Sequence, residues 1–270
     1  MKCVGMSRGA RLLAQRAVSA SLARHSHAAL RDLVDTAVPM GSGIGGKSAL
    51  LQVAGTPVFV KRVPLTDLER QPENVRSTAN LFELPGFCQY GIGGPSFGAW
   101  RELAVHILTT NWVLAGDYEG FPLMYHWRVL PDSTPLPEEL ADVERAVDYW
   151  GGGSQVRRRI EALQQSSASV ALFLEYIPRN LHEWLGEQMA AGGEVADRAC
   201  AMVETGLEAG TLYAQGERPG GIPEAAAAII ARHAPLTAVM ADFFRKLRHE
   251  SRETPYPLEE IRRMMRPMVG

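Results

Sequence analysis

The sequence predicts an α+β fold, in which a small lobe with an antiparallel sheet and one main helix is followed by a mostly helical lobe. Three observations predict it. Residues 37–177 contain short β-rich runs among glycine, proline and aromatic residues. Residues 178–270 are rich in alanine, glutamate and arginine with helical periodicity. Residues 1–36 are basic and helical in character. We therefore expect an N-terminal extension and two lobes with these boundaries.

Composition excludes several classes of protein. Hydrophobic residues make up 46% of the chain and charged residues 21%, which supports a buried core rather than disorder. The net charge of −2 argues against a nucleic-acid partner, and no uncharged apolar stretch is long enough to span a membrane. The three cysteines form no C-x-x-C pair, so we expect no zinc site, no disulfide framework, and a reducing, cytoplasmic compartment.

The N-terminal segment carries an unusual charge. Residues 1–31 contain six basic side chains and no acidic one. This composition is typical of an organellar transit peptide. Arginine and alanine are frequent along the whole chain, so a solvated basic tail, or a true start at Met6, is the favoured interpretation.

The following elements are expected in chain order. A glycine-rich loop comes first, followed by a hairpin whose two short strands are joined by a turn containing Gly55. Next come a helix predicted by the spacing of its apolar residues, an aromatic strand, a continuous apolar strand and a further helix. In sequence, these elements are the loop 41–48, strands 49–53 and 57–63, helix 97–114, strand 121–130, strand 169–176 and a helix from residue 181.

The glycine-rich loop fits two phosphate-binding patterns. Residues 41–48 read as G-x-x-x-x-G-K-S, a P-loop in which Lys47 would pair with phosphates and Ser48 would hold magnesium. With Gly41, Gly43 and Gly46 they also read as G-x-G-x-x-G, the phosphate-covering loop of a protein kinase. A glycine-rich turn without a ligand is the third possibility.

Context favours the second pattern. A P-loop follows a buried strand and opens a helix, whose N-terminus supplies part of the anion site. Here the downstream residues 49–63 alternate like a hairpin and contain Gly55 and Pro57. The kinase loop instead leads, through a turn, to a strand that carries a lysine. The run Val-Phe-Val-Lys ending at Lys61 is close to that V-A-I-K pattern.

Two further segments complete the pattern. Glu102 lies on the expected helix 97–114 and is the best candidate to pair with Lys61, although an ordinary solvated carboxylate is the alternative. The long gap between these two residues implies an inserted loop near residues 80–95. The apolar run 170–178 has the form of a buried strand leading into an extended hinge, or else of a plain core strand.

Residues 41–63, 97–130 and 170–185 resemble the small lobe and hinge of the protein kinase-like family, and more narrowly actinobacterial serine/threonine kinase-like proteins. Residues 222–235 resemble the far C-terminal helices of that group. The resemblance implies ATP-dependent phosphorylation of protein Ser/Thr as the family activity. It implies an adenine bound by the main chain of Glu175 and Ile177, with Leu174 as gatekeeper. The implied nucleotide-binding residues are Gly41, Gly43, Gly46, Lys61, Glu102, Leu174, Glu175 and Ile177.

The catalytic motifs of that family are missing. No histidine after the hinge is followed by the aspartate of H-R-D, and the nearest match to D-F-G is Asp242-Phe243-Phe244, on an expected amphipathic helix. Fewer than a hundred residues follow Glu175. An internal deletion of roughly a hundred residues, judged from typical domain proportions, accounts for both facts. The sequence therefore supplies no catalytic residue and no magnesium ligand, and the remaining helices are expected near 197–212, 224–232, 236–249 and 257–266.

Several functions remain open on this evidence. The leading one is a pseudokinase that binds ATP or another nucleotide weakly, with a protein as a further candidate partner. Loss of the general base alone slows phosphoryl transfer by about 10²–10⁴. An active atypical kinase or small-molecule phosphotransferase would need Asp197 or Glu204 as a substitute base. A non-enzymatic remnant, or interaction protein, is the last alternative.

Overall fold

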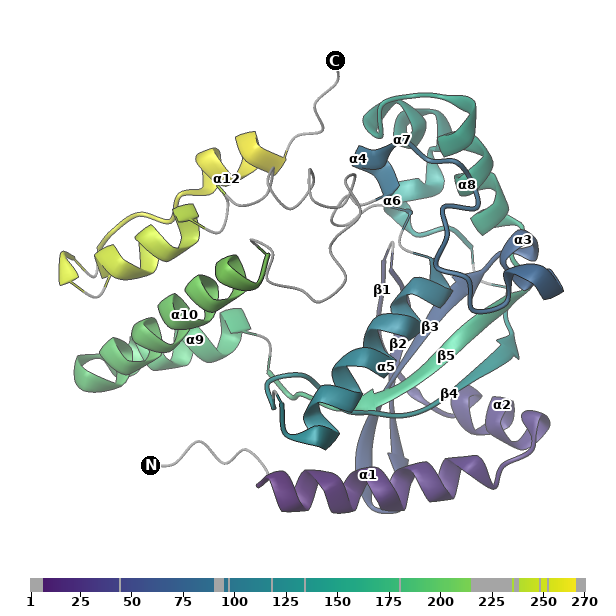
Figure 1. Ribbon diagram of the computed structural model, residues 1–270, viewed down its shortest axis with the longest axis horizontal. Helices are drawn as coiled ribbons and strands as arrows, with labels where there is room; N and C mark the ends of the chain where they lie inside the picture. Colours follow the sequence, from purple (N-terminus) through teal and green to yellow (C-terminus); the bar gives the residue numbers. More distant parts are fainter. Residues whose placement is uncertain are drawn as a thin grey trace. The chain divides into compact units, whose positions relative to one another are not determined.

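A five-stranded antiparallel sheet forms the centre of the first of two compact units in the computed structural model (Figure 1). The first unit comprises Met1–Ile177 and the second Pro178–Gly270, and each is described by itself. The structure describes residues 7–43, 45–89, 95–96, 98–117, 119–133, 135–179, 181–214, 235, 238–247, 249–251 and 253–265.

The sheet has the order β1-β2-β3-β5-β4. All neighbouring pairs are antiparallel, and Lys61 on β3 lies between Ser48 on β2 and Leu172 on β5. The β2–β3 turn has positive φ at Ala54 and Gly55, as a tight hairpin requires. This confirms the expected hairpin. The strands are β1 (Val38–Gly43), β2 (Gly46–Val53), β3 (Thr56–Leu65), β4 (Met124–Pro131) and β5 (Ala168–Glu175).

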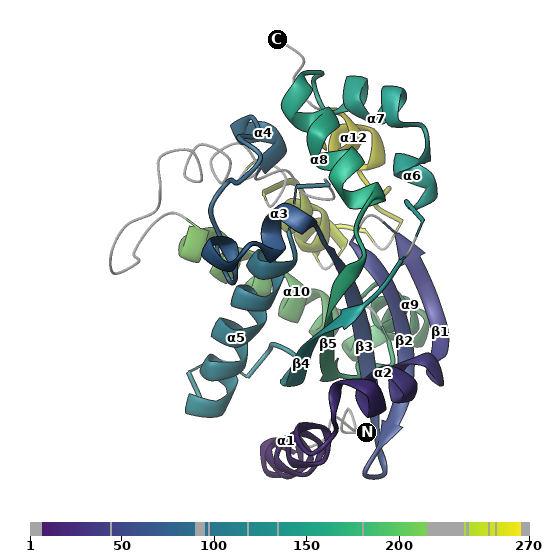
Figure 2. The same cartoon turned by 90° about the vertical axis from the view of Figure 1, so that its right-hand side faces the viewer.

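One long helix, α5 (Ala99–Ala115), covers one face of the sheet (Figure 2). Its buried side chains Trp100 and Leu103 form a core with Val170, Leu172 and Leu174 from β5. The helix ends at Gly116, whose left-handed backbone (φ 86°) suits a glycine. This confirms the helix expected at 97–114, and β4 and β5 lie close to the strands expected at 121–130 and 169–176.

The N-terminal residues are part of the fold, not a solvated tail. They form α1 (Arg8–Ala23) and α2 (His27–Asp35), and α1 crosses the strands near one end of the sheet (Figure 1). Val18, Leu22, Leu30 and Val34 are buried in a core with side chains of the sheet, including Phe173. The basic residues Arg8, Arg16, Arg24 and Arg31 are exposed, so charge composition alone hid an amphipathic pair. The tail interpretation is therefore wrong for residues 8–35.

Two long connections, one from β3 to α5 and one from β4 to β5, pack against each other. The β3–α5 connection contains α3 (Asp67–Arg70), η1 (Pro72–Asn74) and α4 (Gly86–Gln89), in the region where an inserted loop was expected. The β4–β5 connection contains α6 (Glu138–Ala141), α7 (Val143–Tyr149) and α8 (Ser154–Gln164), which the sequence reading did not anticipate. They share a separate hydrophobic core, formed by Phe82, Leu84, Cys88, Leu140, Ala146, Val147, Trp150, Val156, Ile160 and Leu163.

The secondary-structure elements described in the second unit are helices. It contains α9 (Leu181–Ala191), α10 (Gly193–Ala214), a helical segment at 238–247, and α12 (Leu258–Met265). A small core joins Cys200 to Phe244 and Leu247. These helices agree with those expected near 197–212, 236–249 and 257–266, while the one expected at 224–232 lies outside the described residues.

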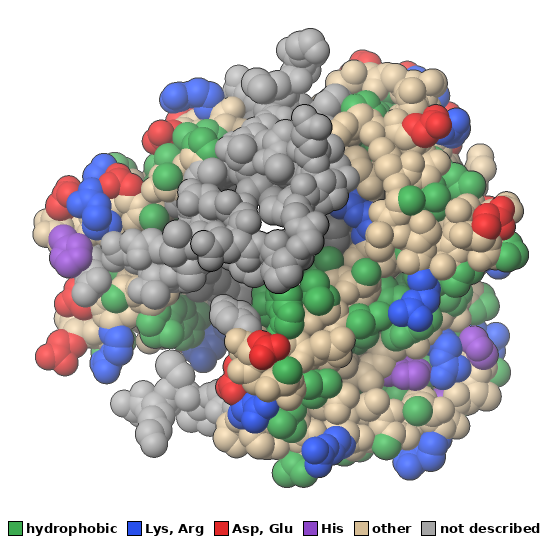
Figure 3. All heavy atoms as spheres, viewed as in Figure 1, with side chains coloured by type: hydrophobic (Ala, Val, Ile, Leu, Met, Phe, Trp, Pro, Cys, Tyr) green, Lys and Arg blue, Asp and Glu red, His purple; other side chains and the backbone are tan. Residues whose placement is uncertain are grey.

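Apolar side chains reach the surface along α5. Val105, Leu108 and Leu114 are exposed, and hydrophobic side chains surface over this part of the molecule in Figure 3. A protein partner, expected from the sequence, stays a prediction. Among the described helices, none combines the length and apolar character needed to cross a membrane.

Candidate functional site

An ion pair joins the middle of the sheet to the covering helix. Nζ of Lys61, on β3, lies 2.6 Å from Oε1 of Glu102, in the first turn of α5. Residues alternate between the two faces of a strand, so Lys61 shares a face with Val63 and Leu65, which pack against α5. The structure thus brings together the two residues that the sequence singled out as partners.

The environment of Glu102 favours its ionised form. Burial alone would raise the pKa of this carboxyl, but hydrogen bonding from His106, one turn along α5, and the charge of Lys61 outweigh it, so the pKa lies below its ordinary value. The N-terminal position in the helix also suits a negative charge. The carboxylate therefore stays charged at neutral pH and holds the Lys61 ammonium in place.

The glycine-rich segment is the β1–β2 hairpin, and its tip lies over this ion pair. A Cβ atom built on Gly45 would lie 3.1 Å from Nζ of Lys61. Gly41 and Gly43 lie on β1. Gly46, on β2, has φ +106°, and a Cβ there would collide with the carbonyl oxygen of Arg62. Glycine at this end of the hairpin lets its backbone approach both β3 and the lysine.

The P-loop interpretation of this segment is wrong. It requires a helix to begin at Ser48, but residues 46–53 form β2. The Ser48 hydroxyl donates to the carbonyl of Gly41. Nζ of Lys47 lies 2.8 Å from Oδ1 of Asp132, just beyond β4, and the same carboxylate receives Nε of Arg62 at 3.0 Å. Lys47 is therefore tied to the opposite edge strand of the sheet instead of being directed at a phosphate.

The expected hinge residues follow at the end of β5. Leu174 is buried in the same core as Trp100 and Leu103. Glu175, the last residue of β5, is buried, and its N–H donates to the carbonyl of Leu123 at 2.7 Å. Ile177 lies two residues beyond the strand and is exposed. The structure thus places these three residues along one strand end, on the strand next to Lys61.

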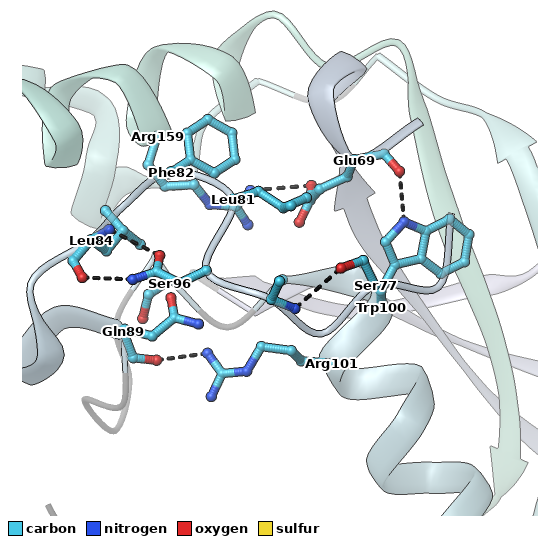
Figure 4. Close-up of a pocket in the computed structure, with 13 residues that line it drawn as sticks. Glu69, Ser77, Leu81, Phe82, Leu84, Gln89, Ser96, Trp100, Arg101 and Arg159 are labelled. Atoms are coloured by element: carbon cyan, nitrogen blue, oxygen red, sulfur yellow. Dashed lines mark hydrogen bonds and ion pairs between the residues drawn. The ribbon is translucent and has the colours of Figure 1, made fainter. Parts of the chain in front are cut away.

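Polar contacts fix α5 at both of its ends. Nε1 of Trp100 donates to the carbonyl of Glu69 at 2.7 Å, and the Met124 N–H donates to Oγ1 of Thr110 at 2.9 Å. Figure 4 shows Trp100 directed toward Glu69, with Arg159 beyond it. Arg159 pairs with Glu69 at 3.1 Å and donates to the carbonyl of Pro95 at 3.0 Å. The two long connections therefore support the helix that carries Glu102.

The cavity drawn in Figure 4 is not a nucleotide site. Its lining includes Glu69, Gln89, Ser96 and Arg159, and its volume is about 20 Å³. That space is enough for a single water. The cavity belongs to the support of α5.

Among the described residues, no three His, Cys, Asp or Glu side chains are close enough to hold a metal ion. Asp242, of the D-F-F segment, lies on the helical segment 238–247 and pairs with Arg245 and Lys246. Its place on a helix agrees with the expectation, while the carboxylate is half-exposed and engaged in ion pairs. Asp197 lies on α10 and the side chain of Glu204 lies outside the described residues, so the substitute-base hypothesis stays a prediction.

Three contributors to this site were missed from the sequence. Arg11 pairs with Glu175, Asp132 holds Lys47, and Arg159 anchors the β3–α5 connection. Arg11 did carry a signal, because it precedes Val18 and Leu22 by seven and eleven residues and so shares their helix face. Asp132 and Arg159 contact segments that are distant in sequence, and no local pattern predicts such contacts.

Comparisons with known proteins do not assign this arrangement. A scan against models of known protein families finds no match for the chain. A search among curated proteins finds no match either.

Proposed function

We propose that this chain is a protein kinase-like nucleotide-binding protein that keeps part of an ATP cradle and lacks the groups for phosphoryl transfer. The observation that carries the proposal is the Lys61–Glu102 ion pair, 2.6 Å long, beneath a glycine hairpin. An active kinase needs such a strand-lysine and helix-glutamate pair to hold the α- and β-phosphates. The buried Leu174 and the strand end at Glu175 supply an apolar wall and main-chain polar groups beside it.

The residues present fit the phosphate half of ATP better than its magnesium ion. The ammonium of Lys61 and the hairpin backbone suit an anion. Magnesium binds through carboxylates, yet the buried carboxylates of Glu102 and Glu175 are paired with Lys61 and Arg11. Weak ATP binding without catalysis follows from this balance.

Nucleotide titration of the full chain tests the binding half of the proposal. We expect ATP to bind weakly and Lys61→Met to weaken it at least about tenfold, the equivalent of one charge-assisted hydrogen bond. The matched control is Lys47→Met, which removes the other hairpin lysine and should leave ATP affinity nearly unchanged. Loss of binding in the Lys47 variant with retention in the Lys61 variant would contradict the assignment.

Turnover tests the other half. Incubation with labelled ATP, magnesium and generic protein substrates should give no phosphate transfer. Robust transfer that disappears in Lys61→Ala would instead establish an active atypical kinase or phosphotransferase. Thermal unfolding that is cooperative and shifted upward by ATP distinguishes a folded pseudokinase from a partly folded remnant.

A further inference from the structure

The side chain of Arg11, on the N-terminal helix α1, binds the side chain of Glu175 at the end of β5. Nε and Nη2 of Arg11 donate to the two carboxylate oxygens of Glu175, at 2.8 and 2.7 Å. Its Nη1 and Nη2 also donate to the carbonyls of Glu119 and Phe121. The side chains of Arg11 and Glu175 are 14% and 6% exposed. A buried, two-pronged contact of this kind fixes geometry as well as charge.

The contact bears directly on the main chain at Glu175. The N–H of Leu123 donates to the Glu175 carboxylate at 3.0 Å, while the N–H of Glu175 donates to the Leu123 carbonyl at 2.7 Å. The side chain of Glu175 thus accepts the hydrogen bond that a main-chain carbonyl would accept in a regular ladder. Arg11 holds this side chain, and so fixes the direction in which the chain leaves β5.

We propose that Arg11 is a positioning residue for the base half of the nucleotide pocket. The inference rests on the proposed function, and it assigns α1 a role in recognising an adenine nucleoside. The proposed pocket places the adenine edge against the main chain of Glu175 and Ile177, where the Glu175 N–H already donates to the Leu123 carbonyl. Arg11 does not touch the nucleotide; it acts by holding Glu175.

Adenosine and ATP affinities, measured on the full chain, separate the two halves of the pocket. In Arg11→Ala we expect both affinities to fall about tenfold, so that their ratio stays unchanged. In Lys61→Met the ratio itself should fall, because ATP loses a phosphate contact that adenosine never makes. Arg16→Ala removes an exposed arginine from the same helix and should change neither affinity.

A double-mutant cycle distinguishes positioning from a general loss of stability. If Arg11 acts through Glu175, Arg11→Ala should weaken adenosine binding in the wild type but not in the Glu175→Gln background. Arg11→Lys keeps the positive charge but cannot make the bidentate contact, so it should bind adenosine more tightly than Arg11→Ala and less tightly than the wild type. Circular dichroism ensures that each variant is compared while folded.

Each other outcome overturns a defined statement. Additive losses in the cycle, a changed ATP-to-adenosine ratio in Arg11→Ala, or ATP binding without adenosine binding would overturn the role of Arg11 alone. A wild-type chain that binds neither ligand would overturn the proposed function itself, and this inference with it.

Discussion

Arg159 and Glu69 form a buried ion pair, with 3.1 Å between Nη1 and Oε2, that joins the β4–β5 connection to the β3–α5 connection. The Arg159 guanidinium also lies over the ring of Phe82, 4.9 Å from its centroid. Oε2 of Glu69 in turn accepts the N–H and hydroxyl of Thr66. The main-chain carbonyl of Glu69 accepts a hydrogen bond from the indole N–H of Trp100, so the ion pair supports the start of α5.

Loss of Arg159 should be costly. Arg159→Ala leaves Glu69 buried without its cation, and breaking one side of such a pair costs about 3–5 kcal/mol. Urea unfolding of the full chain, followed by circular dichroism, measures the change. Arg158→Ala is the matched control, because the neighbouring side chain is 58% exposed. A loss below about 1 kcal/mol in Arg159→Ala, the range of a surface ion pair, would show that the pair is not needed.

The pH dependence of stability should report Glu102. Its folded pKa lies below the ordinary value of 4.5, so the unfolded chain takes up the proton more readily. The stabilisation from this carboxylate is therefore fully present above about pH 4.5 and is lost as the pH falls through the folded pKa. We expect Glu102→Gln to be about 1–3 kcal/mol less stable than wild type at pH 7, with the gap closing below pH 4.5.

Urea titrations at pH 7 and at pH 3.5 measure that gap. Glu138→Gln, which alters an exposed carboxylate on α6, serves as the control and should show little difference at either pH. A gap that stays constant or widens in acid would contradict the stabilising ion pair.

The thiol of Cys88 should be inert in the folded protein. Burial raises the pKa of this side chain to about 11, so almost no thiolate forms near neutral pH. In a Cys3→Ser, Cys200→Ser background, we expect no reaction with a thiol-specific disulfide reagent at pH 8 and complete reaction in urea. Rapid reaction of the native variant would mean that the core shared by the β3–α5 and β4–β5 connections opens readily.

The sequence predicts the parts of this fold that rest on local pattern. The β2–β3 turn, helix α5 and the continuous apolar strand β5 each carry a periodicity or a turn signal that needs no tertiary information. The pairing of Lys61 with Glu102, two residues distant in sequence, could be predicted because the kinase-like pattern names both partners. The position of this ion pair beneath the glycine hairpin is predicted from the same pattern.

The parts that could not be predicted depend on contacts between distant segments. The basic residues of α1 resembled a tail because charge composition does not reveal which helix face is buried. The carboxylate that holds Arg11 lies 164 residues away. Helices α6 to α8 are short, and their apolar residues form a core only by packing against those of the β3–α5 connection. This packing cannot be read from the local sequence.

The two ends of the glycine hairpin should respond very differently to the same substitution. Gly46→Ala meets both a positive φ of +106° and a collision with the Arg62 carbonyl, whereas a Cβ on Gly41 would make one ordinary contact with Ser48 at 3.9 Å. Strain of the backbone alone costs about 1–3 kcal/mol. We expect Gly46→Ala to lose at least that much stability in urea unfolding and Gly41→Ala to lose little, since glycine mid-strand is itself unfavourable. Equal effects at both positions would mean that the hairpin tip does not lie against β3, and Gly45 would then no longer be held over Lys61.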